Sequence, residues 1–218
     1  MMEKNPKNAF QTIRKEYLSS GISRKSLLSD PVEQFGRWFD EALTSGCTEP
    51  NSMALATANA QGMPSLRMVL LKGFDRDGFV FFSNYESRKG RELAENPRGA
   101  LLFYWPELHR QVRLEGGIER LSAAASQAYF HTRPFLSQIG ALASRQSERI
   151  ESREMLERRF MELEEKYRGQ TVPMPDVWGG YLLQPVRFEF WQGRENRLHD
   201  RVAYILQDRR WQKERLSP

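Results

Sequence analysis

The sequence predicts an α+β fold, with an antiparallel, barrel-like sheet and surrounding helices. Segments typical of strands occur early and late in the chain, and a helical stretch lies between them. The connections between the early strands are short, and short connections favour antiparallel pairing over crossover helices. A sheet closed by the terminal strands would account for both observations.

The size and composition of the chain fit one domain. Its 218 residues suffice for one large domain or two small ones, and 39% hydrophobic with 28% charged residues is typical of a globular protein. The sequence shows no internal repeat, low-complexity segment or second core. We therefore expect a single domain over residues 1–218, with residues 1–30 as a mobile arm.

The expected location is the cytoplasm. The first residues, MMEKNPKNAF, contain no apolar segment typical of a secretory signal, and no apolar run reaches the roughly 18 residues of a membrane span. Cys47 is the only cysteine, which excludes a disulfide within the chain and fits a reducing compartment.

The N-terminal third begins with helical signals. The polar, basic residues 1–30 are typical of a loose arm that carries a short helix over 9–18. Asp30 and Pro31 then form a typical helix start, an N-cap followed by proline. An amphipathic helix over 31–45 is predicted by apolar residues at helical spacing, namely Val32, Phe35, Trp38, Phe39 and Ala42.

A block rich in strands follows, interrupted by one helix over 87–95 for which Ser87 is a plausible N-cap. Turn signals such as Asp75-Arg76-Asp77-Gly78 and Asn96-Pro97 separate its strands. The predicted strands are 52–58, 65–72, 79–83, 99–105 and 110–121.

Helices dominate the next stretch, and strands end the chain. The predicted helices are 123–131, 135–143 and 153–168, followed by a loop over 169–178. The predicted terminal strands are 179–183, 186–191, 203–207 and 211–216.

The charge distribution favours small anionic ligands over nucleic acid. The net charge is +5, from 33 basic and 28 acidic residues, and the basic residues are scattered rather than gathered in one run. Such a pattern suits pockets for phosphorylated molecules better than a stripe along a duplex. The three histidines, His109, His131 and His199, show no metal-ligand spacing, so we expect no metal site.

The segment 187–201, RFEFWQGRENRLHDR, combines an aromatic strand with dense charge. Arg197, His199, Asp200 and Arg201 would be costly beside a buried strand without partners. Those partners could be acidic side chains or an anionic ligand. A solvated charged turn after an edge strand explains the pattern equally well.

Arg67 and Lys72 stand at the two ends of RMVLLK. Because their positions differ by an odd number, regular pleating would point them to opposite faces of a strand. Each could then serve a different ligand. The alternative is an edge strand with a solvated basic residue at each end.

Two further groups of polar residues could bind anions. The segment 83–89 runs from a strand into a helix start, where free N–H groups, Arg88 and Lys89 would form a phosphate cradle, unless Ser87 merely caps the helix. Tyr129, Arg133 and Ser137 step by four, and Pro134 would bend that face into a concave corner for a second phosphate, unless the face is simply exposed.

Gln111 and the pair Gln146-Ser147 carry weaker signals. Gln111 could donate an amide to a ring ligand or could face solvent. Gln146-Ser147 adds little alone. Together, the groups imply two anionic ligands.

Five segments give the chain a close resemblance, along nearly its whole length, to the pyridoxamine 5′-phosphate oxidase family. They are RMVLLK at 67–72, SRKGRELAENPR at 87–98, HRQVRLEG at 109–116, YFHTRPFLSQIGALASRQS at 129–147 and FWQGRENRLHDR at 190–201. The last two are the most specific.

The resemblance implies a split β-barrel that works as a homodimer, with FMN at the subunit interface. It implies oxidation of pyridoxamine or pyridoxine 5′-phosphate to pyridoxal 5′-phosphate, with a hydride passing to the flavin and O₂ accepting the electrons to give H₂O₂. It implies no nucleic-acid or membrane partner.

The resemblance also assigns residues by motif position. The FMN set is Arg67, Met68, Val69, Leu70, Leu71, Lys72, Phe82, Ser83, Arg88, Lys89, Gln111, Gln146, Ser147, Trp191 and Arg201. The substrate phosphate set is Lys72, Tyr129, Arg133 and Ser137. Arg197 and His199 lie at the reacting end, and Arg14 and Tyr17 belong to an arm that can close over the substrate. Arg197 suits a clamp on the pyridine ring because it stays charged, whereas His199 could position substrate or accept a proton.

Two positions depart from the family pattern. The family commonly has Tyr-Thr where this chain has Phe82-Ser83, so a hydroxyl is absent at position 82. Arg194 stands where glycine is frequent and adds a charge near the expected site.

Two alternatives compete with this reading. A split-barrel flavin oxidase for another ring, such as a phenazine precursor, would not need the phosphate set. A non-catalytic carrier of pyridoxal phosphate or a basic nucleic-acid-binding module would not need a complete flavin set together with RLHDR.

Overall fold

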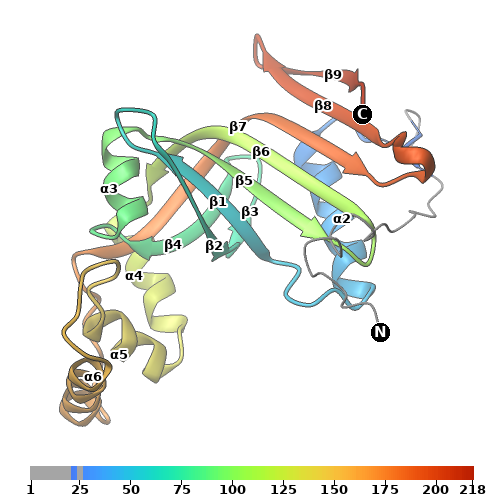
Figure 1. Cartoon of the computed structure of the whole chain (residues 1–218). Helices are drawn as coiled ribbons and strands as arrows, with labels where there is room; N and C mark the ends of the chain where they lie inside the picture. The colour runs from blue at the N-terminus through green and yellow to red at the C-terminus, as the bar shows by residue number, and fades with distance from the viewer. Residues whose placement is uncertain (1–20, 24–26) are drawn as a thin grey trace, which may run out of the picture. The chain divides into compact units, whose positions relative to one another are not determined.

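The computed structural model describes residues 21–23 and 27–218, and it confirms the predicted α+β class (Figure 1). The predicted helix over 9–18, and most of the predicted arm, lie outside these residues. The helices are α2 (Pro31–Thr44), α3 (Arg88–Glu95), α4 (Ala123–Thr132), α5 (Phe135–Ala143), α6 (Arg153–Tyr167) and the 3-10 helix η3 (Glu195–Arg197). The strands are β1 (Ser52–Ala58), β2 (Pro64–Leu70), β3 (Gly73–Phe74), β4 (Phe79–Asn84), β5 (Arg98–Trp105), β6 (Arg110–Arg120), β7 (Trp178–Gln192), β8 (Asp200–Gln207) and β9 (Arg210–Leu216).

The strands of the described residues join in one sheet. Its order is β2-β1-β5-β6-β7-β4-β3, with β8 paired to β7 and β9 paired to β8. The pairs β1–β2, β1–β5, β3–β4, β4–β7 and β8–β9 are antiparallel, as the short connections predict. Strands β2 and β4 also contact each other, so the segments around residues 68 and 82 lie close together.

The last part of the sheet differs from the prediction. Two strands were expected over 179–183 and 186–191, but β7 is continuous across Gln184 and Pro185. Proline lacks an N–H, so a strand can include it only where the ladder does not need that donor. Gly116 of β6 allows the close approach here, because a Cβ at this position would lie 2.0 Å from the carbonyl oxygen of Gln184.

The segment after β2 also differs. The predicted strand over 65–72 ends at Leu70, and Lys72 lies just before the two-residue strand β3. The backbone N–H of Lys72 donates to the carbonyl of Val80 at 2.8 Å, so the backbone of Lys72 is held next to β4.

The chain divides into two compact units, which we describe separately. Unit 1 consists of residues up to Cys47, Tyr104–Val112 and Glu189–Pro218, and unit 2 consists of Thr48–Phe103 and Arg113–Phe188. The single domain expected from the sequence stays a prediction.

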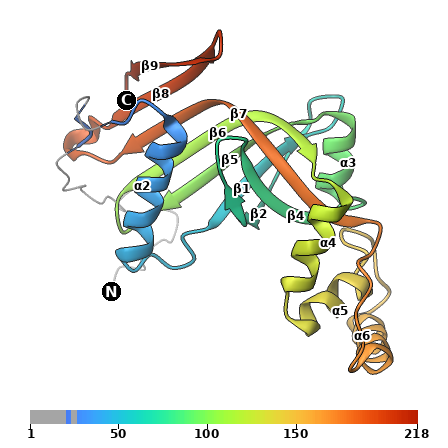
Figure 2. The same ribbon diagram turned by 180° about the vertical axis from the view of Figure 1, so that it is seen from behind.

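Helix α2 supplies much of the core of unit 1 (Figure 2). The carboxylate of Asp30 caps its start by accepting from the N–H of Val32 at 2.8 Å, as the sequence predicts. On its buried face, the ring of Phe35 lies 6.1 Å from Trp105, and Trp38 packs edge-on to Phe190 at 5.2 Å.

Helices α4, α5 and α6 of unit 2 share a second apolar cluster. Phe130, Ile139, Val172 and Trp178 are buried at its centre. Helix α6 has no fully buried residue, but its apolar side chains pack on this cluster from one side. The charged remainder of α6 is the solvated face that its sequence predicts.

Across the part of the chain that the structure describes, no helix is long and apolar enough to cross a membrane.

Candidate active site

Unit 2 contains a cavity of about 650 Å³ between the end of β2, strand β4 and helices α4 and α5. This volume lies within the range of small-molecule sites. The lining residues are Met68, Val69, Leu70, Lys72, Phe82, Ser83, Asn84, Lys89, Tyr129, Arg133, Pro134, Ser137, Gly140, Ala141, Ser144, Gln146 and Trp178. The cavity therefore brings together all four residues of the expected substrate phosphate set and seven of the expected flavin set besides Lys72.

Arg133 is the cation of this cavity that most needs a partner. It is the C-cap of α4, and the proline that follows holds it in an extended conformation. Its Nη1 atom is buried and has no hydrogen-bond partner among the described residues. Leaving such a donor unpaired costs about 1–3 kcal/mol, more for a charged group, so an anion in the cavity would satisfy it.

The surroundings of Arg133 are aromatic. Its guanidinium lies 4.8 Å from the ring centre of Trp178 and 5.6 Å from that of Phe130. Burial lowers the pKa of Arg133 from its ordinary value, but a guanidinium stays charged throughout the physiological range. The site thus keeps a fixed positive charge in a partly apolar wall.

Three stacked rings form that wall. Tyr129 stacks on Phe82 with ring centres 3.8 Å apart, and Phe82 stacks on Trp178 at 5.3 Å. Phenylalanine at position 82 therefore keeps a packing role without a hydroxyl. The hydroxyl of the neighbouring Ser83 donates to Oε1 of Gln146 at 3.2 Å.

Lys89 adds a further positive charge to the lining of the cavity, besides Arg133 and Lys72. Its ammonium donates to Oε1 of Gln146 at 2.8 Å and to the hydroxyl of Ser87 at 3.3 Å. Burial, and then the charge of Arg67, lower the pKa of Lys89 to about 8, while Glu92 opposes the shift. Ser87 also caps α3 as predicted, by accepting from the N–H of Gly90.

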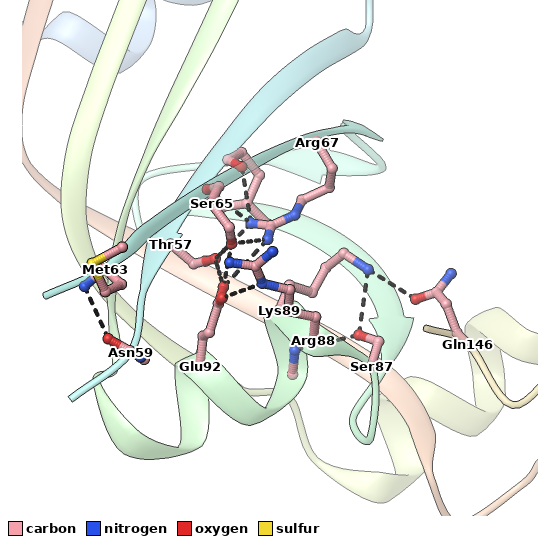
Figure 3. A network of polar contacts seen from close by, with 12 residues as sticks. Thr57, Asn59, Met63, Ser65, Arg67, Ser87, Arg88, Lys89, Glu92 and Gln146 are labelled. Carbon is pink, nitrogen blue, oxygen red and sulfur yellow. Dashed lines mark hydrogen bonds and ion pairs between the residues drawn. The ribbon is translucent and has the colours of Figure 1, made fainter. Parts of the chain in front are cut away.

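A buried carboxylate, Glu92, organises the basic residues next to Lys89 (Figure 3). Its two oxygens accept from the hydroxyls of Thr57 and Ser65 at 2.5 Å and from Nε of Arg88 at 2.9 Å. Arg67 lies 3.3 Å from the same carboxylate. Burial raises the pKa of Glu92, but these bonds outweigh it and lower the pKa to about 2.

Not every expected flavin residue of unit 2 lines the cavity. Arg67 and Arg88 turn toward Glu92, and Leu71 is buried. Ser147 is exposed and has a left-handed backbone, with φ of 72°. The sequence interpretation omitted Trp178 and Glu92. Only Glu92 left a signal, its spacing of four residues from Arg88 on one helix.

The remaining expected site residues that the structure describes belong to unit 1, on β6, β7, β8 and the turn between the last two. Gln111 lies on β6 and is partly buried. Arg201 forms a two-pronged ion pair with Glu189, at 2.8 and 3.1 Å. This pair supplies one of the protein partners that the charge of segment 187–201 requires.

The turn at 194–199 has an unusual backbone. Asn196 and Arg197 both have positive φ, 55° and 60°, a region that side chains other than glycine rarely adopt. Strain of this kind clusters at functional sites. The side chain of Arg197 is exposed.

His199 is oriented by this turn. The backbone N–H of Arg194 donates to Nδ1 of His199 at 3.1 Å, and the ring lies 4.7 Å from the ring of Trp191. Because an N–H can only donate, Nδ1 must offer its lone pair, so the neutral ring carries its proton on Nε2. Burial and the charge of Arg197 lower the pKa of His199, which favours this neutral form.

Arg194, the unusual residue of the motif, is paired as well. Its Nη1 donates to Oδ2 of Asp200 at 3.2 Å. The same carboxylate accepts from the N–H of Ile22 at 2.9 Å and from Arg215 at 2.5 Å. Asp200 therefore ties the end of the described N-terminal segment to β8 and β9. Arg14 and Tyr17 lie outside the described residues.

Among the described residues, no group of three or more His, Cys, Asp or Glu side chains could hold a metal ion.

Comparison with known proteins gives the same family over most of the chain. Residues 39–167 match the family model described as pyridoxamine 5′-phosphate oxidase. Residues 178–218 match the model described as the pyridoxine 5′-phosphate oxidase C-terminal dimerisation region.

Curated relatives are similar over nearly their full length. The pyridoxine/pyridoxamine 5′-phosphate oxidase of Rubrobacter xylanophilus is 58% identical over 206 residues, which cover 94% of this chain and 95% of the relative. The enzyme of the same name from Cupriavidus taiwanensis is 54% identical over 207 residues, covering 94% and 97%.

Solved structures confirm the expected split-barrel fold. PhzG from Burkholderia lata, in complex with tetrahydrophenazine-1-carboxylic acid, matches with a TM-score of 0.87 and 30% identity over 91% of this chain and 98% of that one. A pyridoxamine 5′-phosphate oxidase-related, FMN-binding protein from Nostoc punctiforme matches with a TM-score of 0.69 and 18% identity, covering 87% and 98%. The chain belongs to the pyridoxamine 5′-phosphate oxidase family.

Proposed function

We propose that the protein is an FMN-dependent oxidase that converts pyridoxamine 5′-phosphate and pyridoxine 5′-phosphate to pyridoxal 5′-phosphate. O₂ is the electron acceptor and is reduced to H₂O₂. With pyridoxamine 5′-phosphate, water hydrolyses the oxidised amine to the aldehyde and ammonia is also released. The observation that carries the proposal is the buried Nη1 of Arg133, which has no partner among the described residues and lines one cavity with Lys72, Tyr129 and Ser137. Two cations and two hydroxyls match a phosphate dianion.

The residues of the cavity fit FMN. Lys89, Ser83 and Gln146 form a linked set of donors and acceptors at one side, and Met68, Val69 and Leu70 offer apolar surface beside them. Lys89 in the cavity supplies positive charge for the flavin phosphate, together with Arg67 and Arg88, which lie outside the lining on the carboxylate of Glu92. When bound, FMN accepts the hydride from the substrate and passes the electrons on to O₂.

The protein side of the reaction is mainly orientation. The phosphate set anchors one end of the substrate, and the stacked rings of Tyr129 and Phe82 exclude water from that wall. Arg197 clamps the pyridine ring as a permanent cation. His199 donates from Nε2 to the substrate, because its Nδ1 is engaged by the backbone.

The assembly we propose is a homodimer in the cytoplasm. The family description of residues 178–218 as a dimerisation region supports it, and the single cysteine fits the compartment. Bound FMN should stabilise the dimer by mass action. Sedimentation of a flavin-loaded, fully active monomer would contradict the assembly.

A second candidate is an oxidase for a different ring. It draws support from the likeness to PhzG, which was solved with a phenazine carboxylic acid. The phosphate set favours the first function, because two cations and two hydroxyls match a phosphate dianion, whereas a ring carboxylate carries a single charge.

Oxygen uptake by the purified, flavin-loaded protein tests the proposal. We expect rapid uptake with pyridoxine 5′-phosphate and very slow uptake with pyridoxine, together with one equivalent of H₂O₂ for each aldehyde formed. A protein that binds no flavin, or that oxidises both compounds equally well, would refute it.

A further inference from the structure

We propose that Glu92 is a positioning residue for the cofactor: its carboxylate holds Arg67, directly and through the hydroxyls of Thr57 and Ser65, and bonds Arg88 directly, so that both guanidiniums are ready for the flavin phosphate. The inference rests on the proposed function, since it takes FMN as the ligand. It concerns Glu92, Thr57 and Ser65, which are not in the flavin set expected from the sequence. These three residues also do not line the cavity.

Two hydroxyls bridge Arg67 and Glu92. Nη1 of Arg67 donates to the hydroxyl of Thr57 at 2.5 Å, and Nη2 donates to the hydroxyl of Ser65. Both hydroxyls in turn donate to Oε2 of Glu92. Each hydroxyl donates its one proton to the carboxylate and accepts from the guanidinium with its lone pairs. The two charged groups therefore fix the orientation of both hydroxyls.

Both charged side chains are largely buried. The side chain of Glu92 is 7% exposed and that of Arg67 is 19% exposed. A buried network in which each member is satisfied is rigid, whereas a partly satisfied one is costly. The carbonyl of Leu55 adds a further acceptor for Nη1 of Arg67, at 3.1 Å. The guanidinium of Arg67 is therefore fixed before any ligand arrives, and a ligand loses less side-chain entropy on binding.

The charges of this group do not balance. Arg67, Arg88 and Lys89 are three cations around one carboxylate, which leaves two positive charges (Figure 3). A phosphate monoester carries about −1.5 to −2 at neutral pH, so it would neutralise the group. Without Glu92, Arg67 and Lys89 would face each other with no counter-charge, and Arg67 already disfavours the charged form of Lys89.

Arg88 shows how the group can reach a ligand. Among the described residues, its contact with Glu92 uses Nε, while its side chain is 62% exposed. The carboxylate thus anchors the base of the guanidinium and leaves the outer N–H groups for a phosphate. An arginine offers five N–H donors, so both roles are compatible.

The test uses Glu92→Gln in the full-length, flavin-free chain, with FMN and riboflavin as ligands. Glutamine keeps the size of the side chain but loses the charge and places an N–H against Nε of Arg88. We expect the Kd for FMN to rise by roughly tenfold to a hundredfold, the effect of losing one to two charged hydrogen bonds. The Kd for riboflavin, which lacks the phosphate, should change by less than about threefold.

Two further variants make the result specific. Glu95→Gln places the same substitution on the exposed side of the same helix and should leave both Kd values unchanged. Ser65→Ala removes one bridging hydroxyl without removing a charge, and it should weaken the binding of FMN more than that of riboflavin. This variant tests the role of Glu92 if Glu92→Gln does not fold.

The outcomes are separable. An equal loss of affinity for FMN and riboflavin, or an FMN Kd in both Glu92→Gln and Ser65→Ala that matches Glu95→Gln, would overturn the role of Glu92. A wild-type chain that binds neither flavin would instead refute the proposed function.

Discussion

At the scale of single residues, the site owes its chemistry to groups whose protonation the fold controls. Lys89 and His199 both have a lowered pKa, and burial is the first cause in each case. Burial disfavours the charged form of a base. For Lys89 this makes the charge that we propose for phosphate binding depend on pH near neutrality, and for His199 it favours the neutral ring.

The affinity for FMN should fall as the pH rises through about 8, the pKa of Lys89 in the ligand-free protein. A bound phosphate favours the charged ammonium, so binding raises this pKa and takes up a proton at higher pH. Affinity is then full below about pH 8 and decreases above it by at most about tenfold per pH unit.

Measurements of the Kd for FMN between about pH 7 and 9 would show this decrease in affinity as a step. The variant Lys89→Arg keeps its charge and should lose the step. A wild-type Kd that is flat over the range, or a step that persists in Lys89→Arg, would show that another group titrates.

His199→Gln should retain much of the activity, whereas His199→Ala should not. Glutamine can place an N–H near the position of Nε2, and it does not titrate. This outcome follows if His199 donates a hydrogen bond, because the N–H of Arg194 already occupies Nδ1. Values of kcat for the two variants provide the measurement, and a Gln variant as slow as the Ala variant would favour proton acceptance by His199.

At the scale of elements, the sheet depends on close backbone approach between β6 and β7. A Cβ on Gly116 would lie 2.0 Å from the carbonyl oxygen of Gln184, too close for any real contact. The neighbouring Gly117 has open space, with its nearest atom 4.0 Å away. The two glycines therefore differ sharply in the room they offer, although they are adjacent.

We expect Gly116→Ala to lower the free energy of unfolding by about 1–3 kcal/mol, the usual cost of overpacking. Gly117→Ala, the matched control, should change it by less than about 0.5 kcal/mol. Urea unfolding of the two variants would measure the difference, and equal stability would mean that β7 moves aside without cost.

Sequence patterns predicted elements well where the signals were local. Helix α5 and strand β1 match the predicted ranges, and α2 ends one residue earlier than expected. The division of β7 was wrong because Gln184-Pro185 resembles a turn when only neighbours along the chain are considered. The partner strand that accommodates the proline is nearly 70 residues away in sequence, from Gly116 to Gln184.

At the scale of the whole molecule, the cavity of unit 2 is assembled from segments that lie far apart in sequence. Lys72 follows β2, Tyr129 is on α4 and Ser137 is on α5. Spacing by four predicted that Tyr129, Arg133 and Ser137 share one side, and all three line the cavity. Spacing could not predict that Lys72 joins them, because only the sheet brings β2 and β4 together.

Glu92 and Trp178 show the limit of such predictions. The charge pattern around Glu92 is typical of a solvated helix face, but the hydroxyls that bury it belong to β1 and β2. Trp178 follows a loop without periodicity, and only the packing on Phe82 and Arg133 gives it a place in the site.

The proposed role of Arg133 and its neighbours in the cavity is to hold the substrate phosphate, and the kinetics of one variant on two substrates test this role. The kcat/KM of Arg133→Leu should fall by roughly tenfold to a hundredfold on pyridoxine 5′-phosphate, the effect of losing a charged hydrogen bond, while the slow reaction with pyridoxine and the flavin content change little. Arg145→Leu, an exposed arginine after α5, is the matched control and should behave as wild type on both compounds. An equal loss on pyridoxine 5′-phosphate and pyridoxine in Arg133→Leu would contradict the claim and assign Arg133 a structural role.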